Sequence, residues 1–199
     1  MRESPRFESQ PELGPRSREL EPIQPGIVAI FTASAAGEPM IEQTSVLVKA
    51  GLGIIGDRYA AREGTYSGKV ATRKSGQKIG DEERQITFIS LPGIGQANQI
   101  LKAQGEQPFT MAETRRSVVV SISAEALNNL EKKRFRFGGI EFEGIEKCDP
   151  CKRPPRLAGR PKNKEHLFED AFTDRGGLRA RILNDGRLHA GDSLKLPSA

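Results

Sequence analysis

An alternating run on both sides of a glycine pair constrains the fold of this chain more than any other feature. Arginine or glutamate alternates with apolar residues over positions 134–137 and again over 140–143, and Gly138-Gly139 separates the two runs. Successive side chains of a strand point to opposite faces, so this alternation indicates two strands that each bury one face. A glycine pair between such runs is typical of a tight hairpin turn. The sequence therefore predicts a fold organised around β-sheet.

Further strand-like runs, rich in β-branched and aromatic residues, are distributed over the rest of the chain. Few helices are indicated: residues 92–103 carry one apolar face, Ser123 can cap a short helix through Leu130, and another short helix is expected around residues 165–170. The expected strands are residues 27–31, 45–49, 85–89, 116–120, 134–137, 140–143, 178–183 and 193–196. Many short strands with few short helices predict a mainly β fold, with the strands forming a closed or nearly closed β-barrel.

Composition divides the chain into a short tail and one domain. Residues 1–25 are rich in Pro, Glu, Arg and Ser and poor in large apolar residues, which predicts a flexible N-terminal tail. Residues 26–199 are enough for a single domain with a substantial core. Within that domain, residues 62–83 are dominated by Gly, Lys, Ser and charged residues and are expected to form a long loop. A solvated loop and a lid over an anionic ligand both remain open for this segment.

Charge and hydropathy narrow the classes of function. The net charge is +5 over 199 residues, with basic residues spread among many acidic ones. This balance favours anionic ligands over a dedicated nucleic-acid binder. No apolar run approaches the roughly 20 residues needed to cross a bilayer, and the N-terminus lacks the apolar core of a signal peptide. Because two cysteines do not form a disulfide framework, we expect a cytoplasmic protein with reduced thiols.

The two cysteines of the chain, Cys148 and Cys151, follow the expected hairpin directly and lie among basic residues. Neighbouring Lys and Arg stabilise the thiolate, which is the reactive form of the side chain and a soft metal ligand. Four interpretations remain open: a zinc site that also uses His166 or His189, a thioredoxin-like redox pair, inert buried cysteines, and a reactive or metal-binding thiol. Pro154-Pro155 disfavours the redox pair, since two prolines there cannot open a long helix.

Other residues are candidates for binding an anion. Arg115-Arg116 precedes a strand, and arginine binds phosphate bidentately, although paired arginines at a strand end are also typical of a solvated edge. Asp57-Arg58 follows a glycine-rich turn and is either a turn-stabilising ion pair or, if buried, a pair that orients Arg58 toward an anion. Gly176-Gly177 indicates either a turn or a close backbone approach. Neither a P-loop nor a Ser-His-Asp triad can be derived from the sequence.

Several short segments occur in an ordered set: Gly56-Asp57-Arg58-Tyr59, Arg84-Gln85-Ile86-Thr87, Thr114-Arg115-Arg116-Ser117, Leu127-Asn128-Asn129-Leu130, Arg134-Phe135-Arg136-Phe137-Gly138, Cys148-Asp149-Pro150-Cys151, Arg175-Gly176-Gly177-Leu178-Arg179-Ala180-Arg181 and Gly191-Asp192. This set resembles the MOSC domain, the module at the C-terminus of molybdenum-cofactor sulfurases, which also occurs as stand-alone bacterial proteins and in amidoxime-reducing enzymes. The resemblance extends over about residues 26–196, and the ordered set is more specific than any one motif.

The resemblance implies a fold like that of the MOSC and pyruvate-kinase barrels, with a cleft for the phosphorylated pterin of the molybdenum cofactor. It implies that Cys151 is the catalytic residue: either it ligates molybdenum or it carries a persulfide. Ser117 stands where the family commonly has Asn, and Tyr59 stands where it commonly has His. The cofactor-binding residues implied by the resemblance are Arg115, Arg116, Ser117, Asp57, Arg58, Tyr59, Gly176 and Gly177.

The function implied by the resemblance is binding of the molybdenum cofactor and reduction of an N-oxygenated small molecule. The electrons are expected from a partner protein, because the chain has no flavin or iron–sulfur motif. One alternative is a sulfur carrier that receives a persulfide on Cys151 from a separate cysteine desulfurase, since a pyridoxal-phosphate domain does not fit into this length. Another alternative is a non-catalytic module that stores or inserts the cofactor.

Overall fold

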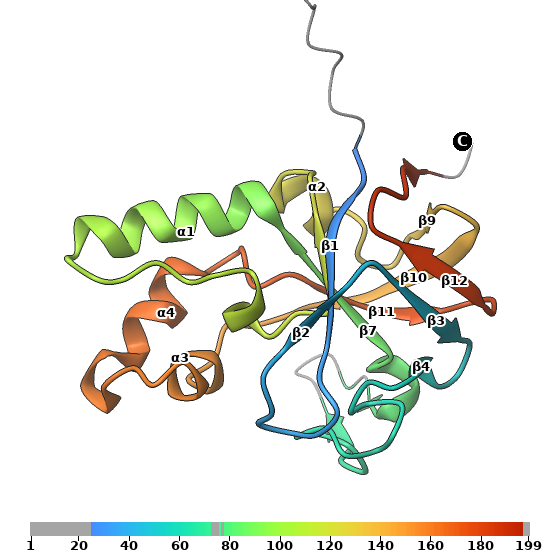
Figure 1. The fold of residues 1–199 in the computed structure, drawn as a ribbon, viewed down its shortest axis with the longest axis horizontal. Helices are drawn as coiled ribbons and strands as arrows, with labels where there is room; N and C mark the ends of the chain where they lie inside the picture. The colour runs from blue at the N-terminus through green and yellow to red at the C-terminus, as the bar shows by residue number, and fades with distance from the viewer. Residues whose placement is uncertain (1–24, 73–75, 77, 197–199) are drawn as a thin grey trace, which may run out of the picture.

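The computed structural model describes residues 25–72, 76 and 78–196, so nearly all of the expected N-terminal tail, residues 1–25, lies outside the described residues. The described chain is mainly sheet, with four short α-helices (Figure 1). The strands are β1 (Ile27–Thr32), β2 (Ile41–Gln43), β3 (Ser45–Lys49), β4 (Gly53–Ile54), β5 (Ala71–Thr72), β6 (Lys78–Ile79), β7 (Ile86–Ser90), β8 (Val118–Val120), β9 (Arg134–Phe137), β10 (Ile140–Lys147), β11 (Leu178–Ile182), β12 (Gly186–His189) and β13 (Leu194–Lys195). The helices are α1 (Leu91–Ala103), α2 (Ala124–Asn128), α3 (Arg153–Leu157) and α4 (Glu165–Ala171).

One curled sheet of eight strands forms the body of the molecule, in the order β13-β9-β10-β11-β7-β8-β1-β2. Its neighbouring strands pair antiparallel except for β7 and β8, which pair in parallel. An antiparallel bridge between Gly26 and Ser193 joins the start of β1 to the segment that enters β13, so the curled sheet nearly closes. A second sheet, β12-β3-β4, packs beside it. The mainly β, barrel-like fold class predicted from the sequence is confirmed.

The hairpin predicted from the alternating run is present as β9 and β10, and Phe135 faces Phe142 across it. The buried face of this hairpin packs its phenylalanines against Phe88 of β7, with ring centroids 5.2 to 5.5 Å apart. The arginines of β9 lie on the exposed face, as the period-two pattern requires. This aromatic cluster is at the centre of the barrel core, and it fixes the strand β10, which leads directly into the cysteines.

A second core lies on the other face of β7 and β8, where α1 and α4 cover the sheet (Figure 1). Ser90 caps α1, because its Oγ accepts a hydrogen bond of 2.9 Å from the backbone N–H of Gly93. The apolar face predicted for this helix is buried at Ile94, Ala97 and Leu101. Ser123 caps α2 in the same way, as expected. No helix in the described part of the chain has the length and apolar character needed to span a membrane.

The structure departs from the sequence expectations mainly in its shortest elements. The strands β2, β4, β5, β6 and β12 were not expected, since two to four residues carry too little periodicity to be identified. The segment 62–83, expected as a long loop, contains among its described residues the antiparallel pair β5–β6 and a 3₁₀ turn at 81–83. The short helix α3 follows the cysteines, since prolines are compatible with a first helical turn although they cannot open a long helix.

Candidate functional site

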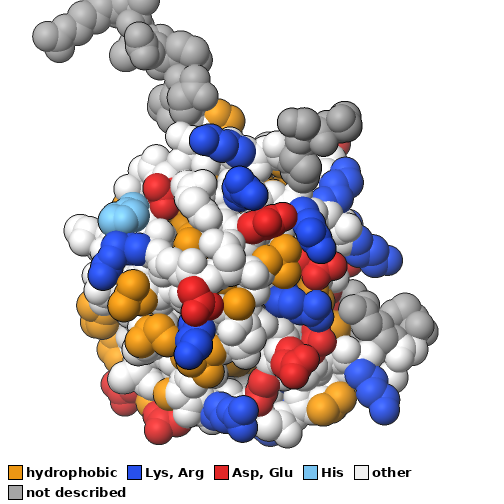
Figure 2. All heavy atoms as spheres, turned by 90° about the vertical axis from the view of Figure 1, so that its right-hand side faces the viewer, with side chains coloured by type: hydrophobic (Ala, Val, Ile, Leu, Met, Phe, Trp, Pro, Cys, Tyr) orange, Lys and Arg blue, Asp and Glu red, His pale blue; other side chains and the backbone are white. Residues whose placement is uncertain are grey.

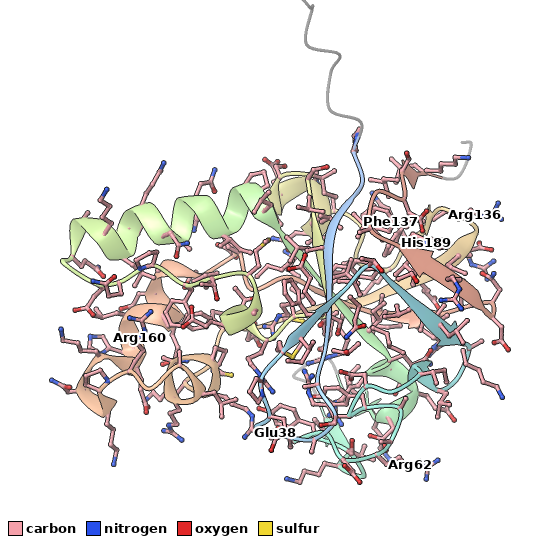
Figure 3. All side chains as sticks on the ribbon, in the orientation of Figure 1. Glu38, Arg62, Arg136, Phe137, Arg160 and His189 are labelled. Carbon is pink, nitrogen blue, oxygen red and sulfur yellow. The ribbon has the colours of Figure 1, made fainter. Side chains whose placement is uncertain are left out.

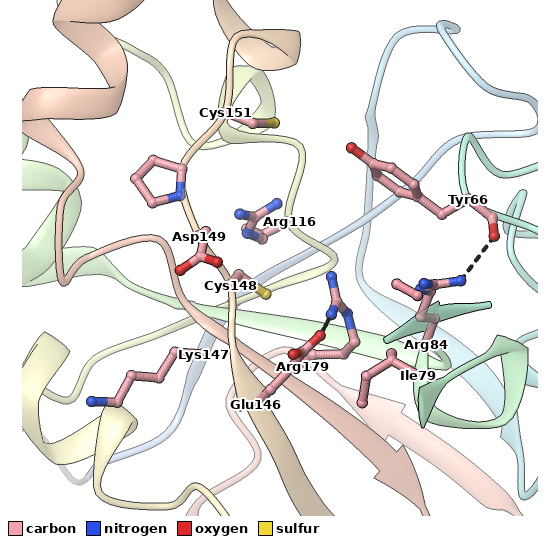
Figure 4. Close-up of a pocket in the computed structure, with 12 residues that line it drawn as sticks. Tyr66, Ile79, Arg84, Arg116, Glu146, Lys147, Cys148, Asp149, Cys151 and Arg179 are labelled. Atoms are coloured by element: carbon pink, nitrogen blue, oxygen red, sulfur yellow. Dashed lines mark hydrogen bonds and ion pairs between the residues drawn. The ribbon is translucent and has the colours of Figure 1, made fainter. Parts of the chain in front are cut away.

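A cavity of about 700 Å³ opens where β10 ends and the cysteine segment, residues 148–151, begins. Figure 4 shows that the segment forms one wall and that residues from the 62–83 segment form the opposite wall. The lining residues are Tyr66, Ala71, Ile79, Arg84, Arg116, Glu146, Lys147, Cys148, Asp149, Pro150, Cys151 and Arg179. Both cysteines therefore lie at one cavity, together with basic side chains. A cavity of this volume is in the range used by small-molecule and cofactor sites.

Three arginines reach this cavity from three neighbouring strands. Arg179 lies on β11, Arg84 lies two residues before β7, and Arg116 lies two residues before β8. The strands are adjacent in the order β11-β7-β8, so side chains far apart in the sequence meet at one end of the sheet. Guanidinium groups gathered in this way form an electropositive surface that suits an anionic ligand.

The cysteine segment is held against the chain that enters β11. The backbone N–H of Cys148 donates a hydrogen bond of 2.7 Å to the carbonyl oxygen of Gly177. Cys148 is only 5% exposed, whereas Cys151 is half-buried at the cavity, and both thiols are reduced. Figure 4 shows the two sulfur atoms on the side of the segment that faces Arg116. Cys151 is thus the more accessible of the two thiols.

The glycine pair links the cysteine segment to Arg116. The Nε of Arg116 donates a hydrogen bond of 2.7 Å to the carbonyl oxygen of Gly176. A Cβ on Gly176 would lie 1.9 Å from the carbonyl oxygen of Cys148, and a Cβ on Gly177 would lie 2.1 Å from that of Phe88. Gly177 also has φ +98°, in the region that favours glycine. Of the two interpretations for this pair, the structure therefore shows the close backbone approach.

Arg84 and Arg179 each have a partner within the site. The Nη1 of Arg84 donates to the carbonyl oxygens of Tyr66, at 2.9 Å, and of Lys69, so this arginine anchors the wall that carries Tyr66. Arg179 forms an ion pair with Glu146, and both side chains are mostly buried. Arg116 uses Nε for its bond to the backbone, which leaves its two terminal nitrogen groups directed toward the cavity (Figure 4). Arg116 is therefore the arginine best placed to bind an anion bidentately.

Asp57 and Arg58 form a buried ion pair with 3.1 Å between Oδ1 and Nη1. The Oδ1 of Asp57 also accepts a hydrogen bond from the backbone N–H of Ala33, and its Oδ2 accepts one from that of Tyr59. These bonds fix the turn that leads away from β4, and neither member of the pair lines the cavity. Burial raises the pKa of Tyr59, while the charges of Arg58, Arg179 and Arg116 oppose the rise.

Arg115 points away from its neighbour Arg116 and lines a separate cavity of about 370 Å³. Its backbone is left-handed, with φ +64°, which turns consecutive side chains in different directions. Burial lowers the pKa of Arg115 to about 10, and the charges of Arg58 and Arg153 lower it as well. The hydroxyl of Ser117 lies 3.2 Å from Oγ1 of Thr87 in the sheet, so it joins the chain entering β8 to β7, and Ser117 does not line the cavity.

The structure thus places Cys151 and Arg116 at one cavity, and the other expected site residues do not line it. The site residues predicted from the sequence did not include the cavity-lining residues Arg84, Arg179, Glu146 and Tyr66. Arg84 and Arg179 do belong to the ordered segments quoted above, but only the strand order shows that they converge. Tyr66 carried no signal, because it lies in a segment without periodicity.

The donor set at the cavity fits an organic cofactor that brings its own metal. Among the described residues, no three His, Cys, Asp or Glu side chains gather as a metal site, so they offer no multi-ligand zinc centre. A single thiolate added to a metal already held by a cofactor needs no such cluster. Cys151 supplies that soft donor, and Arg116 supplies a group suited to phosphate. The residues present are therefore compatible with a phosphorylated, metal-carrying ligand.

Comparison with solved structures shows the same fold in bacterial proteins. The chain is similar to YuaD from Bacillus subtilis, with a TM-score of 0.63 and 19% identity over 85% of this chain and 94% of that one. It is also similar to YiiM from Geobacillus stearothermophilus (TM-score 0.58, 14% identity, 87% and 75% of the two chains) and to YiiM from Escherichia coli (0.56, 13%, 89% and 71%). At these identities the likeness shows the fold alone.

The comparison with protein families identifies the chain. No curated protein sequence matches it. The sequence model of the MOSC domain matches residues 75–195, which is more than half of the chain and includes Arg84, Arg116, both cysteines and Arg179. The Gly-Asp-Arg segment at 56–58 precedes the matched range. This family is associated with molybdenum-cofactor binding. The sequence, the barrel and the family match agree: the chain belongs to the MOSC domain family.

Proposed function

We propose that this protein binds the molybdenum cofactor in the 700 Å³ cavity and reduces an N-oxygenated small molecule there. The observation that carries the proposal is the presence of the Cys151 thiol and the Arg116 guanidinium at one cavity. A soft ligand and a bidentate phosphate ligand are the two protein groups that a metal-carrying phosphorylated pterin requires. When bound, the cofactor supplies a redox-active molybdenum centre, which the protein's own residues do not provide.

The protein's own residues would bind the cofactor, orient it and shield it from solvent. Cys151 would donate its thiolate to the metal, and Arg116 would hold the phosphate through its terminal nitrogen groups. The Arg179–Glu146 pair would keep the cavity floor charged but locally balanced, which limits the cost of burying an anion there. Tyr66, on the wall across from Cys151, would contact a substrate that enters between them.

The reaction balances only with an external electron source. Reduction of an N-hydroxylated substrate breaks the N–O bond, consumes two electrons and two protons, and releases the oxygen as water. Because neither thiol of the site can turn over repeatedly as the reductant, a partner protein would deliver the electrons. The expected electron-donor partner is therefore part of this proposal.

The test is metal and pterin analysis of the protein purified from a host that makes the cofactor. Wild type is expected to contain molybdenum and pterin near one per chain, and Cys151→Ala is expected to lose the metal while it keeps its fold. Cys148→Ala is the matched control, because it removes the other thiol of the same cavity. Full molybdenum content in Cys151→Ala, or none in folded wild type, would contradict the proposal. Binding without turnover would instead indicate the storage or insertion module.

A sulfur carrier is the second candidate, and the specific observation in its favour is that two reduced thiols line one cavity. In that case a cysteine desulfurase would transfer a sulfur atom to Cys151 as a persulfide. Mass spectrometry after incubation with a desulfurase and cysteine should then show one added sulfur that a reductant removes. Persulfide on Cys151 in a protein that binds no cofactor would select this candidate over the reductase.

A further inference from the structure

The segment that follows Cys151 concentrates positive charge beside the cavity. Residues 152–164 contain six Lys or Arg residues and no Asp or Glu, whereas the whole chain is nearly balanced at 31 basic and 26 acidic residues. In the structure this segment forms α3 and a 3₁₀ turn that leads into α4. We call its six basic residues the basic ridge: Lys152, Arg153, Arg156, Arg160, Lys162 and Lys164.

Three of these basic residues are tied down by neighbouring groups. Arg156 forms a bidentate ion pair with Glu165, with 2.7 Å between Nε and Oε1 and 3.0 Å between Nη2 and Oε2. Lys164 pairs with Glu106 at 2.6 Å. Arg160 lies over the ring of Phe109 and donates to the carbonyl oxygen of Pro108, and Figure 3 labels it on this helical side of the molecule. These contacts fasten the basic ridge to α4 and to the chain after α1.

The other three, Lys152, Arg153 and Lys162, form no ion pair with any carboxylate of the described residues, so their charge is available to a partner. The hydrogen bond from Arg156 lowers the pKa of Glu165, and the charges of Lys152 and Lys162 lower it further. Both lysines therefore lie near the same carboxylate. The charge of Arg153 likewise lowers the pKa of Arg115. The basic ridge is thus a run of positive charge along the chain, and it begins one residue after Cys151.

At the end of the described structure away from the helices, basic and acidic side chains are mixed. Figure 2 shows the face formed around β3, β9 and β12, where blue basic and red acidic side chains are interspersed. Arg134 and Arg136 of β9, for example, both lie within 4 Å of the carboxylate of Glu141. The basic ridge differs from this face, because no Asp or Glu interrupts its positive charge along the chain from 152 to 164. A charged surface of one sign steers a partner of opposite sign and orients it as it docks.

We propose that the basic ridge is the docking surface for the acidic face of a small redox protein, which would deliver electrons beside Cys151. This inference rests on the proposed function for the need of electrons, but the docking itself does not require the cofactor. A protein partner is favoured over a nucleic acid because the positive surface is short and is interrupted by Leu157, which is 40% exposed. Apolar contacts within a polar rim are typical of protein interfaces.

The experiment is a binding titration of the purified full chain with oxidised flavodoxin, a small acidic flavoprotein, as the probe. Association is expected at low ionic strength and should weaken as salt is added. The double variant Lys152→Glu with Lys162→Glu should lower the affinity by about tenfold or more, since both charges are reversed at the docking surface. The matched control is Lys49→Glu with Lys195→Glu, two exposed lysines on β3 and β13 at the other end of the molecule. It should retain the wild-type affinity.

Three results would overturn the proposal: no association with wild type at low salt, equal weakening in the control variant, or equally tight binding of a short DNA duplex that is also lost on Lys152→Glu with Lys162→Glu. The last result would make the basic ridge a surface for polyanions in general. Circular dichroism of each variant shows that it is folded. The titration measures association and does not depend on the cofactor. If the protein proves to lack molybdenum, the proposed function is refuted, but the titration still tests the docking surface.

Discussion

Substitution of Gly176 by alanine tests the link between the cysteine segment and Arg116. The added Cβ would lie 1.9 Å from the carbonyl oxygen of Cys148 and 3.3 Å from Cδ of Pro150. Real Cβ contacts do not fall below 3.0 Å, so the cysteine segment must move by about 1 Å or more. The backbone of Gly176 is in a region open to any residue, so the effect is steric alone. Overpacking of this kind typically costs about 1–3 kcal/mol.

Urea unfolding measures that cost. With a urea dependence of about 1–3 kcal/mol per molar, the midpoint of Gly176→Ala should fall by roughly 1 M while the slope stays unchanged. The moved segment should also expose Cys148, so its alkylation by iodoacetamide in the folded state should become faster. Gly95→Ala is the matched control, because Gly95 lies inside α1 and its added Cβ has nothing within 4 Å. Alanine there should raise the stability by up to about 1 kcal/mol.

The reasoning fails if Gly176→Ala unfolds at the wild-type urea concentration and its Cys148 reacts at the wild-type rate. In that case the backbone contact between the glycine pair and the cysteine segment would not be a constraint on either. Gly176→Ala could instead lose stability while Cys148 reacts at the wild-type rate. The backbone shift would then lie in the chain before β11, and the two thiols would keep their positions. That outcome would also contradict the proposed coupling between the glycine pair and the site.

Three further changes test other parts of the structure. Phe142→Ala, at the centre of the aromatic core, should cost about 3–5 kcal/mol in urea unfolding. Ser90→Ala should cost about 1 kcal/mol, because it removes the cap of α1. Hydrogen bonding by Arg156 lowers the pKa of Glu165, so the stability from this pair is present above the ordinary carboxyl range and is lost as the pH falls through the depressed value. Melting temperatures from pH 7 to pH 3 should therefore drop less steeply in Glu165→Gln than in wild type.

The sequence predicted the barrel well where side chains alternate over four or more residues. The β9–β10 hairpin, β7 and β11 all contain such runs or long apolar stretches, and their burial follows the pattern. It did not predict the two-residue strands β4, β5 and β6, whose pairing depends on the chain around them. The extension of β10 to Lys147 was also missed, because Gly144 interrupts the alternation where the pairing register shifts.

The candidate site was predicted in part, for a reason that lies in the topology. A thiol among basic residues is recognisable in the sequence, since its chemistry depends on local neighbours. Arg84, Arg116 and Arg179 are separated by 30 residues or more, and only the order β11-β7-β8 brings them to one end of the sheet. A sequence cannot give that order unless the strand pairing is known. The arginine pair illustrates the limit: Arg115 and Arg116 are adjacent in the chain, yet one left-handed residue directs them to different cavities.

The glycine pair shows how a binding site can depend on residues that contact no ligand. The carbonyl oxygen of Gly176 accepts from Nε of Arg116, and that of Gly177 accepts from the backbone N–H of Cys148, so one dipeptide contacts both Arg116 and the start of the segment that leads to Cys151. Only residues without a Cβ allow the two approaches at once. The glycine pair therefore holds the Arg116 side chain and the backbone at Cys148 close to the same short stretch of chain. A site built in this way tolerates change in its outer wall, at Tyr66 for example, more readily than in these two glycines.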